Sequence, residues 1–229
     1  MLFVVPTPLG NLEDMTARAL RVLKESSVVF CEDTRHTRML MSHFGLSTPL
    51  ERYDENDRRS LEKLLERVSR GDSVSLVSDG GCPGVSDPGR RVVAAARRES
   101  LPVTALPGPS ALACAVAGSG LPGDSFVFLG FLPRTTSKRR RTLEEAKALG
   151  RTIVVYESPF RVLELLADAE AALGPAAQCA AARELSKIHE EWVRGSVASV
   201  QADFAARAEI LGEFVVLFHP KTEPAHDRA

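Results

Sequence analysis

The segments LFVVPTPLGN (residues 2–11), VSLVSDGGCPG (74–84) and VTALPGPSA (103–111) share one pattern, in which a short apolar run enters a turn rich in glycine and proline. Helical patterns lie between the apolar runs, which predicts parallel strands joined by helices. Because parallel strands end at the same edge of a sheet, the three turns are expected to meet where open α/β sheets bind ligands. Turns with few side chains let the backbone approach a small polar ligand closely.

Composition narrows the class of protein. The chain has 229 residues, of which 44% are hydrophobic and 26% charged, as is typical of a soluble globular protein. Its net charge of -1 excludes a protein that is basic overall, although not a local basic patch. No apolar run reaches the roughly 20 residues of a membrane span, and no signal peptide is expected. The four cysteines lack a C-x-x-C spacing and are expected to be reduced thiols of a cytoplasmic protein.

Two domains are predicted. Turn-forming residues cluster at 118–124, and the pattern of strands and helices restarts after them. Domains are therefore expected at 1–118 and 124–220, followed by a polar tail at 221–229. The expected fold class is α/β, with two α/β/α domains in series and a cleft between them.

Local signals set the expected boundaries of several elements. Asp14 is placed to cap a helix that follows it, and Asp87-Pro88 has the pattern of a cap followed by proline in the first turn of a helix. In the second domain, the apolar run at 213–219 is expected to form a buried strand that closes the fold.

The signatures of several other enzyme classes are missing. No G-x-G-x-x-G follows the first strand, and neither a P-loop nor a G-x-S-x-G elbow is present. The histidines are scattered, so no metal site is predicted. The chemistry is therefore expected to come from a small molecule held by the glycine-rich turns.

Further motifs occur in a fixed order along the chain. They are PTPLGNLEDMTARA (6–19), EDTRHT (32–37), SDG through DPG (78–89), LPGPS (106–110), YESPFR (156–161) and ARELSK (182–187). Together they make the chain, from about Leu2 to Phe218, resemble the small-subunit ribosomal RNA 2'-O-ribose cytidine methyltransferases. These are S-adenosylmethionine enzymes of the tetrapyrrole-methylase superfamily. One departure is Cys82, where the family usually has threonine.

The resemblance implies a homodimeric enzyme that holds S-adenosyl-L-methionine between its two domains. The cofactor would lie against the loops that contain Leu9, Gly10, Cys82, Val85, Ser110, Ala111 and Tyr156. Asp79 is a further candidate, because its carboxylate could contact the amino or sulfonium end of the cofactor. An aspartate in a turn equally often bonds its own backbone.

Methyl transfer to a ribose hydroxyl requires oxygen, methyl carbon and sulfur to be aligned, and a base that takes the proton would help. Polar residues at the expected strand ends are candidates for that base. Each has an alternative structural role, such as capping the next helix or pairing with a neighbouring charge. The candidates are Glu32, Asp33, His36, Glu157, Glu184 and Lys187.

One dense basic cluster is present, formed by Lys138, Arg139, Arg140 and Arg141. Such a run is often only the solvated start of a helix, but helix amino termini disfavour cations. The cluster therefore indicates a phosphate-contacting patch for RNA, which Arg35 and Arg161 could extend.

Three functions stay open at this point. The first is 2'-O-methylation of a cytidine in small-subunit (16S) ribosomal RNA, either as naked RNA or in an assembled subunit. The second is methylation of a corrinoid or another tetrapyrrole, and the third is a non-catalytic cofactor-binding or RNA-binding assembly factor. The basic cluster favours RNA, because a tetrapyrrole enzyme needs no phosphate-binding surface.

Overall fold

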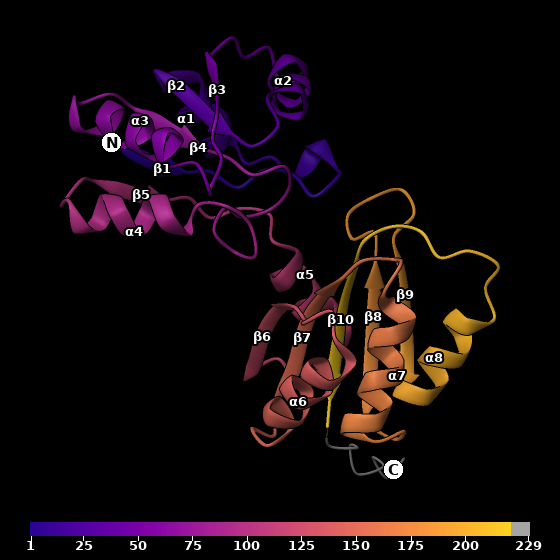
Figure 1. Cartoon of the computed structure of the whole chain (residues 1–229). Coiled ribbons are helices and arrows are strands. Elements are labelled where there is room, and N and C mark those ends of the chain that lie inside the picture. Colours follow the sequence, from indigo (N-terminus) through magenta and orange to yellow (C-terminus); the bar gives the residue numbers. More distant parts are fainter. Residues whose placement is uncertain (221–229) are drawn as a thin grey trace. The chain divides into compact units, whose positions relative to one another are not determined.

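A computed structural model describes residues 1–220 of the chain, and the predicted polar tail at 221–229 lies outside the described residues. The chain forms two compact units, Met1–Ser110 and Ala111–Ala229. Each unit is built on its own five-stranded sheet (Figure 1). The predicted α/β class with two domains is confirmed.

The first unit contains a parallel sheet. Its elements are β1 (Leu2–Val4), a 3-10 helix (Leu12–Asp14), α1 (Ala17–Glu25), β2 (Val28–Cys31), α2 (Thr34–His43), β3 (Leu50–Arg52), α3 (Arg58–Ser69), β4 (Val74–Leu76), α4 (Arg90–Arg98) and β5 (Val103–Ala105). The strand order is β3-β2-β4-β1-β5, and every pair is parallel. The turns after β4, β1 and β5 therefore leave neighbouring strands at one edge of the sheet.

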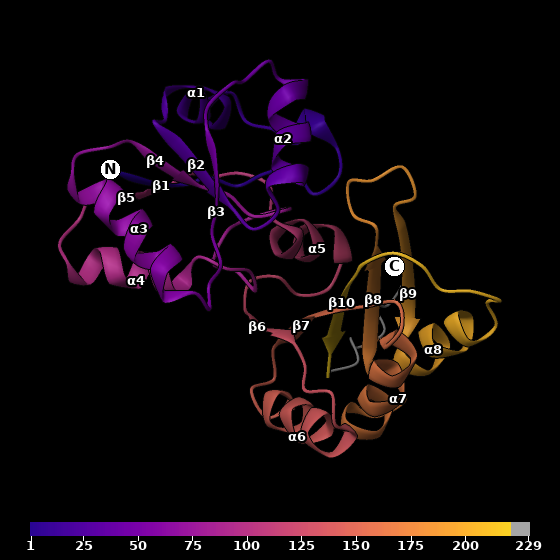
Figure 2. The same ribbon diagram turned by 45° about the horizontal axis from the view of Figure 1, so that its top comes forward.

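Alternation along the strands buries both faces of this sheet. Val28 and Phe30 of β2 pack in an apolar cluster with α3 and α4, whereas Val29 and Cys31 pack in a second cluster with α1 and α2. The unit thus has three layers, with helices on both faces of the sheet (Figures 1 and 2).

The first helix of this unit starts later than predicted. Asp14 ends the short 3-10 helix instead of capping α1. The cap of α1 is Thr16, whose hydroxyl oxygen accepts a hydrogen bond from the Ala19 amide at 3.1 Å. Aspartate and threonine are both favourable cap residues. Thr16 is the cap here because Asp14 belongs to the short 3-10 helix that precedes α1.

The prediction that Asp87 caps α4 is wrong in the same way. The cap position of α4 is Gly89, with φ of +134° and no side-chain cap bond of its own. The carboxylate of Glu55 takes this role, because it accepts hydrogen bonds from the amides of Gly89 (2.6 Å) and Arg91 (3.1 Å). The buried Tyr53 hydroxyl donates to the same carboxylate at 3.1 Å and holds it in place.

The second unit contains a mixed sheet. Its elements are α5 (Ala111–Ser119), β6 (Phe126–Phe131), α6 (Thr136–Lys147), β7 (Thr152–Glu157), α7 (Val162–Leu173), β8 (Gln178–Arg183), β9 (Glu191–Ser196), α8 (Val197–Ala205) and β10 (Phe214–His219). The strand order is β6-β7-β10-β8-β9, with β6 parallel to β7 and the other pairs antiparallel. Every residue of the central strand β10 is buried, as predicted for the closing strand.

Helices cover both faces of this sheet as well. Residues of α6, α7 and α8 share one apolar cluster with the sheet, and residues of α5 share the cluster on the opposite face (Figure 2). Because α5 packs on the second sheet, the division between the units falls before this helix. It differs from the boundary expected at 118–124, where the turn-forming residues begin inside α5.

None of the helices in residues 1–220 is long and apolar enough to cross a membrane. The four cysteines are free thiols.

The Glu55 cap can be tested by Glu55→Gln, which removes one acceptor oxygen and turns an amide group toward backbone donors. We expect the free energy of unfolding, measured by urea denaturation, to fall by about 1–2 kcal/mol, as for other lost caps. The matched control is Glu62→Gln, which removes an exposed ion pair with Arg58 (2.7 Å) and is expected to change stability by less than about 1 kcal/mol. Equal effects of the two substitutions would contradict the cap.

Candidate active site

Backbone hydrogen bonds join the turn after β1 to the turn after β4. The Thr7 amide donates to the Gly81 carbonyl and the Gly81 amide donates to the Thr7 carbonyl, both at 2.9 Å. The buried Thr7 hydroxyl also donates to the Ser78 carbonyl at 2.9 Å. These two turns therefore form one rigid element beyond the ends of their strands. Sequence reasoning did not single out Thr7; its position between two prolines, within a buried turn, is the signal that could have found it.

The turn after β5 packs against the same element. A Cβ at Gly108 would lie 2.8 Å from the Cβ of Pro6, so only glycine fits there without movement. Gly81 has φ of +83°, and a Cβ at this position would lie 3.2 Å from the Leu9 side chain and 4.0 Å from the Pro109 carbonyl oxygen. The predicted convergence of the three turns is thus confirmed.

The residues predicted to contact the cofactor divide between the two units. In the first unit, Leu9 and Gly10 follow β1, Asp79, Cys82 and Val85 follow β4, and Ser110 follows β5. The structure therefore brings these residues to one edge of the parallel sheet. Ala111 begins α5 and Tyr156 lies near the end of β7, both in the second unit.

Asp79 and Cys82 have different environments on the turn after β4. Asp79 is exposed, and within residues 1–220 its carboxylate accepts no hydrogen bond, so it does not cap its own turn. Cys82 is half-buried, and burial, followed by the negative charge of Asp87, raises the pKa of its thiol. A neutral thiol is a packing group rather than a nucleophile, so Cys82 offers the site a small apolar surface where threonine would offer a hydroxyl.

Glu32 lies at the same edge, directly after β2, which is the neighbour of β4 in the sheet. Burial is the first cause that raises the pKa of its carboxyl, and the negative charges of Asp79 and Asp87 add to this effect. Within the described residues, its side chain has no hydrogen-bond or ion-pair partner. Among the predicted base candidates, Glu32 is therefore the one whose carboxylate forms no hydrogen bond or ion pair within the described residues.

Asp33 caps helix α2, which is the structural alternative to a role as base that the sequence left open. Its carboxylate caps α2 by accepting hydrogen bonds from the amides of Arg35 (2.8 Å) and His36 (3.4 Å). The Arg35 side chain also donates to it, and these bonds lower the pKa of Asp33 to about 2. Such a carboxylate is a weak base. Arg35 is exposed but paired, and His36 is exposed on the first turn of α2.

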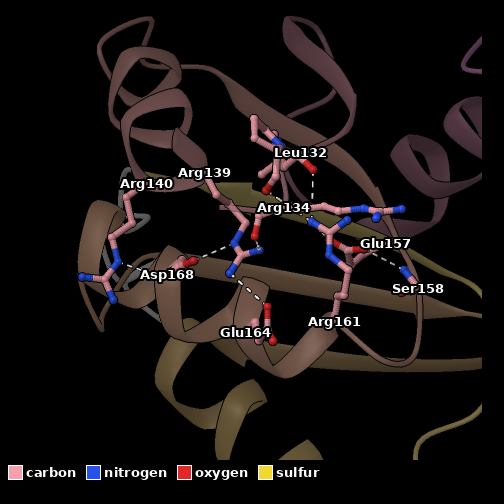
Figure 3. Close-up of polar contacts among 10 residues, drawn as sticks. Leu132, Arg134, Arg139, Arg140, Glu157, Ser158, Arg161, Glu164 and Asp168 are labelled. Atoms are coloured by element: carbon pink, nitrogen blue, oxygen red, sulfur yellow. Dashed lines mark hydrogen bonds and ion pairs between the residues drawn. The ribbon is translucent and has the colours of Figure 1, made fainter. Parts of the chain in front are cut away.

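Glu157 and Arg161 form a clamp in the second unit. Glu157 is 2% exposed, and burial raises the pKa of its carboxyl despite the hydrogen bond from the Ser158 amide (2.9 Å) and the nearby Arg161 charge. The Arg161 guanidinium lies 3.3 Å from that carboxylate and donates to the carbonyls of Leu132 (3.0 Å) and Pro133 (3.3 Å) (Figure 3). Arg161 thus ties the turn after β7 to the turn after β6, and Glu157 pairs with Arg161 within the turn after β7.

Glu184 and Lys187 are engaged with each other. Glu184 has φ of +53°, and its carboxylate accepts hydrogen bonds from the Lys187 ammonium (2.8 Å) and the Glu213 amide (2.9 Å). Burial alone would favour the neutral form of each group, but their mutual hydrogen bond lowers the pKa of Glu184 and raises the pKa of Lys187. Both stay charged, which suits a structural ion pair rather than proton transfer.

Two of the four residues of the basic cluster pair with carboxylates of α7. Arg139 is 1% exposed and donates to Asp168 (2.6 Å) and Glu164 (3.3 Å), and Arg140 donates to the other oxygen of Asp168 at 2.6 Å (Figure 3). The buried Arg139 cannot contact a phosphate in this structure, which corrects its predicted role. The four basic residues lie near the start of α6, and the second of them, Arg139, lies in the interface between α6 and α7. The linear sequence gives no sign of this burial.

The other two members of the cluster are exposed. Lys138 has no carboxylate partner among the described residues, and Arg141 pairs with Glu145 at 2.8 Å on the surface of α6. Within the described residues, Lys138 is therefore the member of the cluster that keeps an unpaired positive charge for an RNA surface.

The fold of this chain is also found in solved structures. A crystal structure of diphthine synthase matches it with a TM-score of 0.74 at 16% identity, over 96% of this chain and 90% of that chain. The family model described as Tetrapyrrole (Corrin/Porphyrin) Methylases matches residues 1–201.

Two relatives are much closer in sequence. The Ribosomal RNA small subunit methyltransferase I of Thermotoga maritima is 42% identical over 96% of this chain and 98% of its own length. The protein of the same name from Hydrogenobaculum sp. is 40% identical over 94% of each chain. The chain belongs to the tetrapyrrole methylase family. It is a methyltransferase, and S-adenosylmethionine is its methyl donor.

The contact between the turns after β1 and β5 can be tested by Gly108→Ala. The added methyl group overlaps Pro6, so the turns must separate, and we expect at least a tenfold loss of S-adenosylmethionine affinity by calorimetry, since binding needs closely placed backbone groups. Gly118→Ala is the matched control, because its Cβ would lie 2.6 Å from the Trp192 ring in the second unit. Both substitutions should lower the melting temperature, but only Gly108→Ala should alter cofactor affinity. Equal cofactor affinity in the two variants would contradict the assignment of the three joined turns to cofactor binding.

The structural role of Arg139 can be tested by Arg139→Gln. We expect the free energy of unfolding to fall by about 3 kcal/mol, the lower end for a broken buried pair, because Arg140 still reaches Asp168. Arg141→Gln, an exposed neighbour on the same helix, should leave the urea midpoint near that of the wild type. A stable Arg139→Gln variant with weakened RNA binding would restore the role predicted from the sequence.

Proposed function

We propose that this chain transfers the methyl group of S-adenosylmethionine to a ribose 2'-oxygen of a cytidine in small-subunit (16S) ribosomal RNA. The observation that carries the proposal is identity of 40–42% over at least 94% of the chain to proteins named for this RNA. The alternative, a tetrapyrrole or corrinoid acceptor, receives no support from these relatives. We also propose that the enzyme acts as a cytoplasmic homodimer, on the RNA or on the assembled small subunit.

The three joined turns fit the cofactor. Carboxylate, amino and hydroxyl groups of S-adenosylmethionine need hydrogen-bonding groups at close range, and turns built from glycine and proline provide backbone groups with little side-chain cover. The positions Leu9, Gly10, Cys82, Val85 and Ser110 lie on these turns, and we assign them to cofactor binding.

Two further contacts to the cofactor follow from charge and position. The exposed carboxylate of Asp79 suits the cationic amino or sulfonium end, since its negative charge is not spent on a partner within the described residues. In the second unit, we assign Ala111 and Tyr156 to the same ligand, as the resemblance implies.

Glu32 is the proposed proton acceptor. As the methyl group moves to the ribose oxygen, the hydroxyl proton must leave, and a carboxylate with a raised pKa takes it more readily than an ordinary one. Glu32 has such a pKa and an unengaged side chain, whereas Asp33, Glu157 and Glu184 each hold structural partners. His36 remains the second choice, because it lies on the adjacent helix turn.

The proposal is tested by transfer of tritiated methyl groups from S-adenosylmethionine to small ribosomal subunits that lack the modification, followed by mapping of the labelled nucleotide. Label on the ribose of one cytidine is expected. Absence of label on RNA, with cofactor binding intact, would contradict the proposed function.

The role of Glu32 is tested by Glu32→Gln in the same assay. The base must be ionised, so the wild-type rate should rise with pH through the raised pKa of Glu32 and then level off. The variant should lose this rise and about 10²- to 10⁴-fold in rate, with cofactor affinity unchanged. Glu25→Gln, which removes an exposed ion pair with Arg21, is the control and should keep both rate and pH profile. An unchanged profile in Glu32→Gln would exclude Glu32 as the base.

A further inference from the structure

Two phenylalanine side chains are exposed at one edge of the second sheet. Phe160 lies in the turn after β7 and is 88% exposed, and Phe131 ends β6 and is 58% exposed. Strands β6 and β7 are parallel neighbours, so Phe131, the last residue of β6, and Phe160, just after β7, lie at the carboxyl ends of adjacent strands. We call these two residues the aromatic rim.

A bulge in β6 gives Phe131 its position. Phe128 pairs with Val154 and Phe131 pairs with Tyr156, so β6 has one more residue than β7 between these two pairs. The bulge lies next to Gly130, with φ of +61°. Side chains alternate along a regular strand, so Phe131, three residues after Phe128, would face the opposite side of the sheet if β6 had no bulge. With the bulge, the rings of Phe128 and Phe131 both contact Tyr156, at centroid distances of 4.9 and 5.8 Å.

The turns that carry the aromatic rim are fixed to each other. Arg161, next to Phe160, donates to the carbonyls of Leu132 and Pro133, which follow Phe131 (Figure 3). The buried carboxylate of Glu157 lies beside the same guanidinium. Turns fixed in this way lose little backbone freedom when a ligand packs against the rings that they carry.

The surroundings of the aromatic rim are positively charged. Arg134 and Lys138 follow Phe131 in the chain, both are exposed, and neither has a carboxylate partner within residues 1–220. Two acidic residues close to Phe160 in the chain are already paired, because Glu157 is buried beside Arg161 and Glu164 accepts from Arg139.

We infer that the aromatic rim is a stacking surface for unpaired RNA bases, with Arg134 and Lys138 contacting the phosphates beside them. Single-stranded RNA is bound by this combination of exposed aromatic rings and cations. The inference rests on the proposed function, since it concerns how the same RNA is held.

The test measures binding of a fluorescent, unstructured, cytidine-rich oligoribonucleotide by anisotropy. Phe160→Leu keeps an apolar side chain but removes the ring, and we expect about tenfold weaker binding with an unchanged salt dependence. Phe160→Trp should bind at least as well as the wild type. Arg134→Gln should instead reduce the slope of log affinity against log salt by about one.

Matched controls lie at the opposite edge of the same sheet, before β7. Leu149→Ala removes a half-exposed apolar side chain (54%), and Arg151→Gln removes an exposed cation. Both should bind the oligonucleotide like the wild type. Cofactor affinity, measured by calorimetry, should be the same in all variants.

Two results would overturn the inference. One is equal RNA affinity of Phe160→Leu and the wild type. The other is a change of sedimentation coefficient in Phe160→Leu, which would make the aromatic rim an interface between copies. Failure of the proposed function is recognised separately, because the wild type would then bind cofactor but transfer no methyl group to RNA.

Discussion

The pair of backbone hydrogen bonds between Thr7 and Gly81 is the constraint on which the first unit's site depends. Strands β1 and β4 bring the two turns to the same edge, but their ends alone do not determine how the turns lie. The reciprocal bonds fix the two turns to each other beyond the last residues of their strands. The turn after β5 packs against Pro6 of this pair. A ligand meets a prearranged backbone rather than loops that must be ordered on binding, and such prearrangement lowers the entropy lost on binding.

The second unit reaches the same rigidity by a different means. Its turns after β6 and β7 are joined by side chains, with Arg161 as donor and main-chain carbonyls as acceptors. Behind them, Arg139, Asp168 and Glu164 lock α6 to α7. Buried ions of this kind are expensive to dehydrate and strongly destabilising to break, so they specify one packing of the two helices more than they add to stability.

Much of this organisation could be predicted from the sequence. The alternation of apolar runs and turns identified the strands and the meeting of the glycine-rich turns, because strand direction and turn chemistry are local properties. Asp33 shows the limit of such reasoning: its position after a strand fitted both a base and a helix cap, and only the amides of Arg35 and His36 decide for the cap. The structural roles of Arg139 and Glu55 were not predicted, for a related reason. Their partners are distant in sequence, and neither burial nor a cap supplied by another loop leaves a trace in a linear pattern.

The Glu55 cap also anchors one end of the segment between β4 and α4. Gly81, near the start of this segment, is bonded to Thr7, and Gly89, at its end, is bonded to a carboxylate 34 residues earlier in the chain. The loop with Cys82 and Val85 is therefore anchored at both ends to parts of the chain that precede it. The first turn of α4 lacks its side-chain cap until the loop after β3 has docked. The order of the cofactor loop is thus coupled to the docking of two other loops, those after β1 and β3.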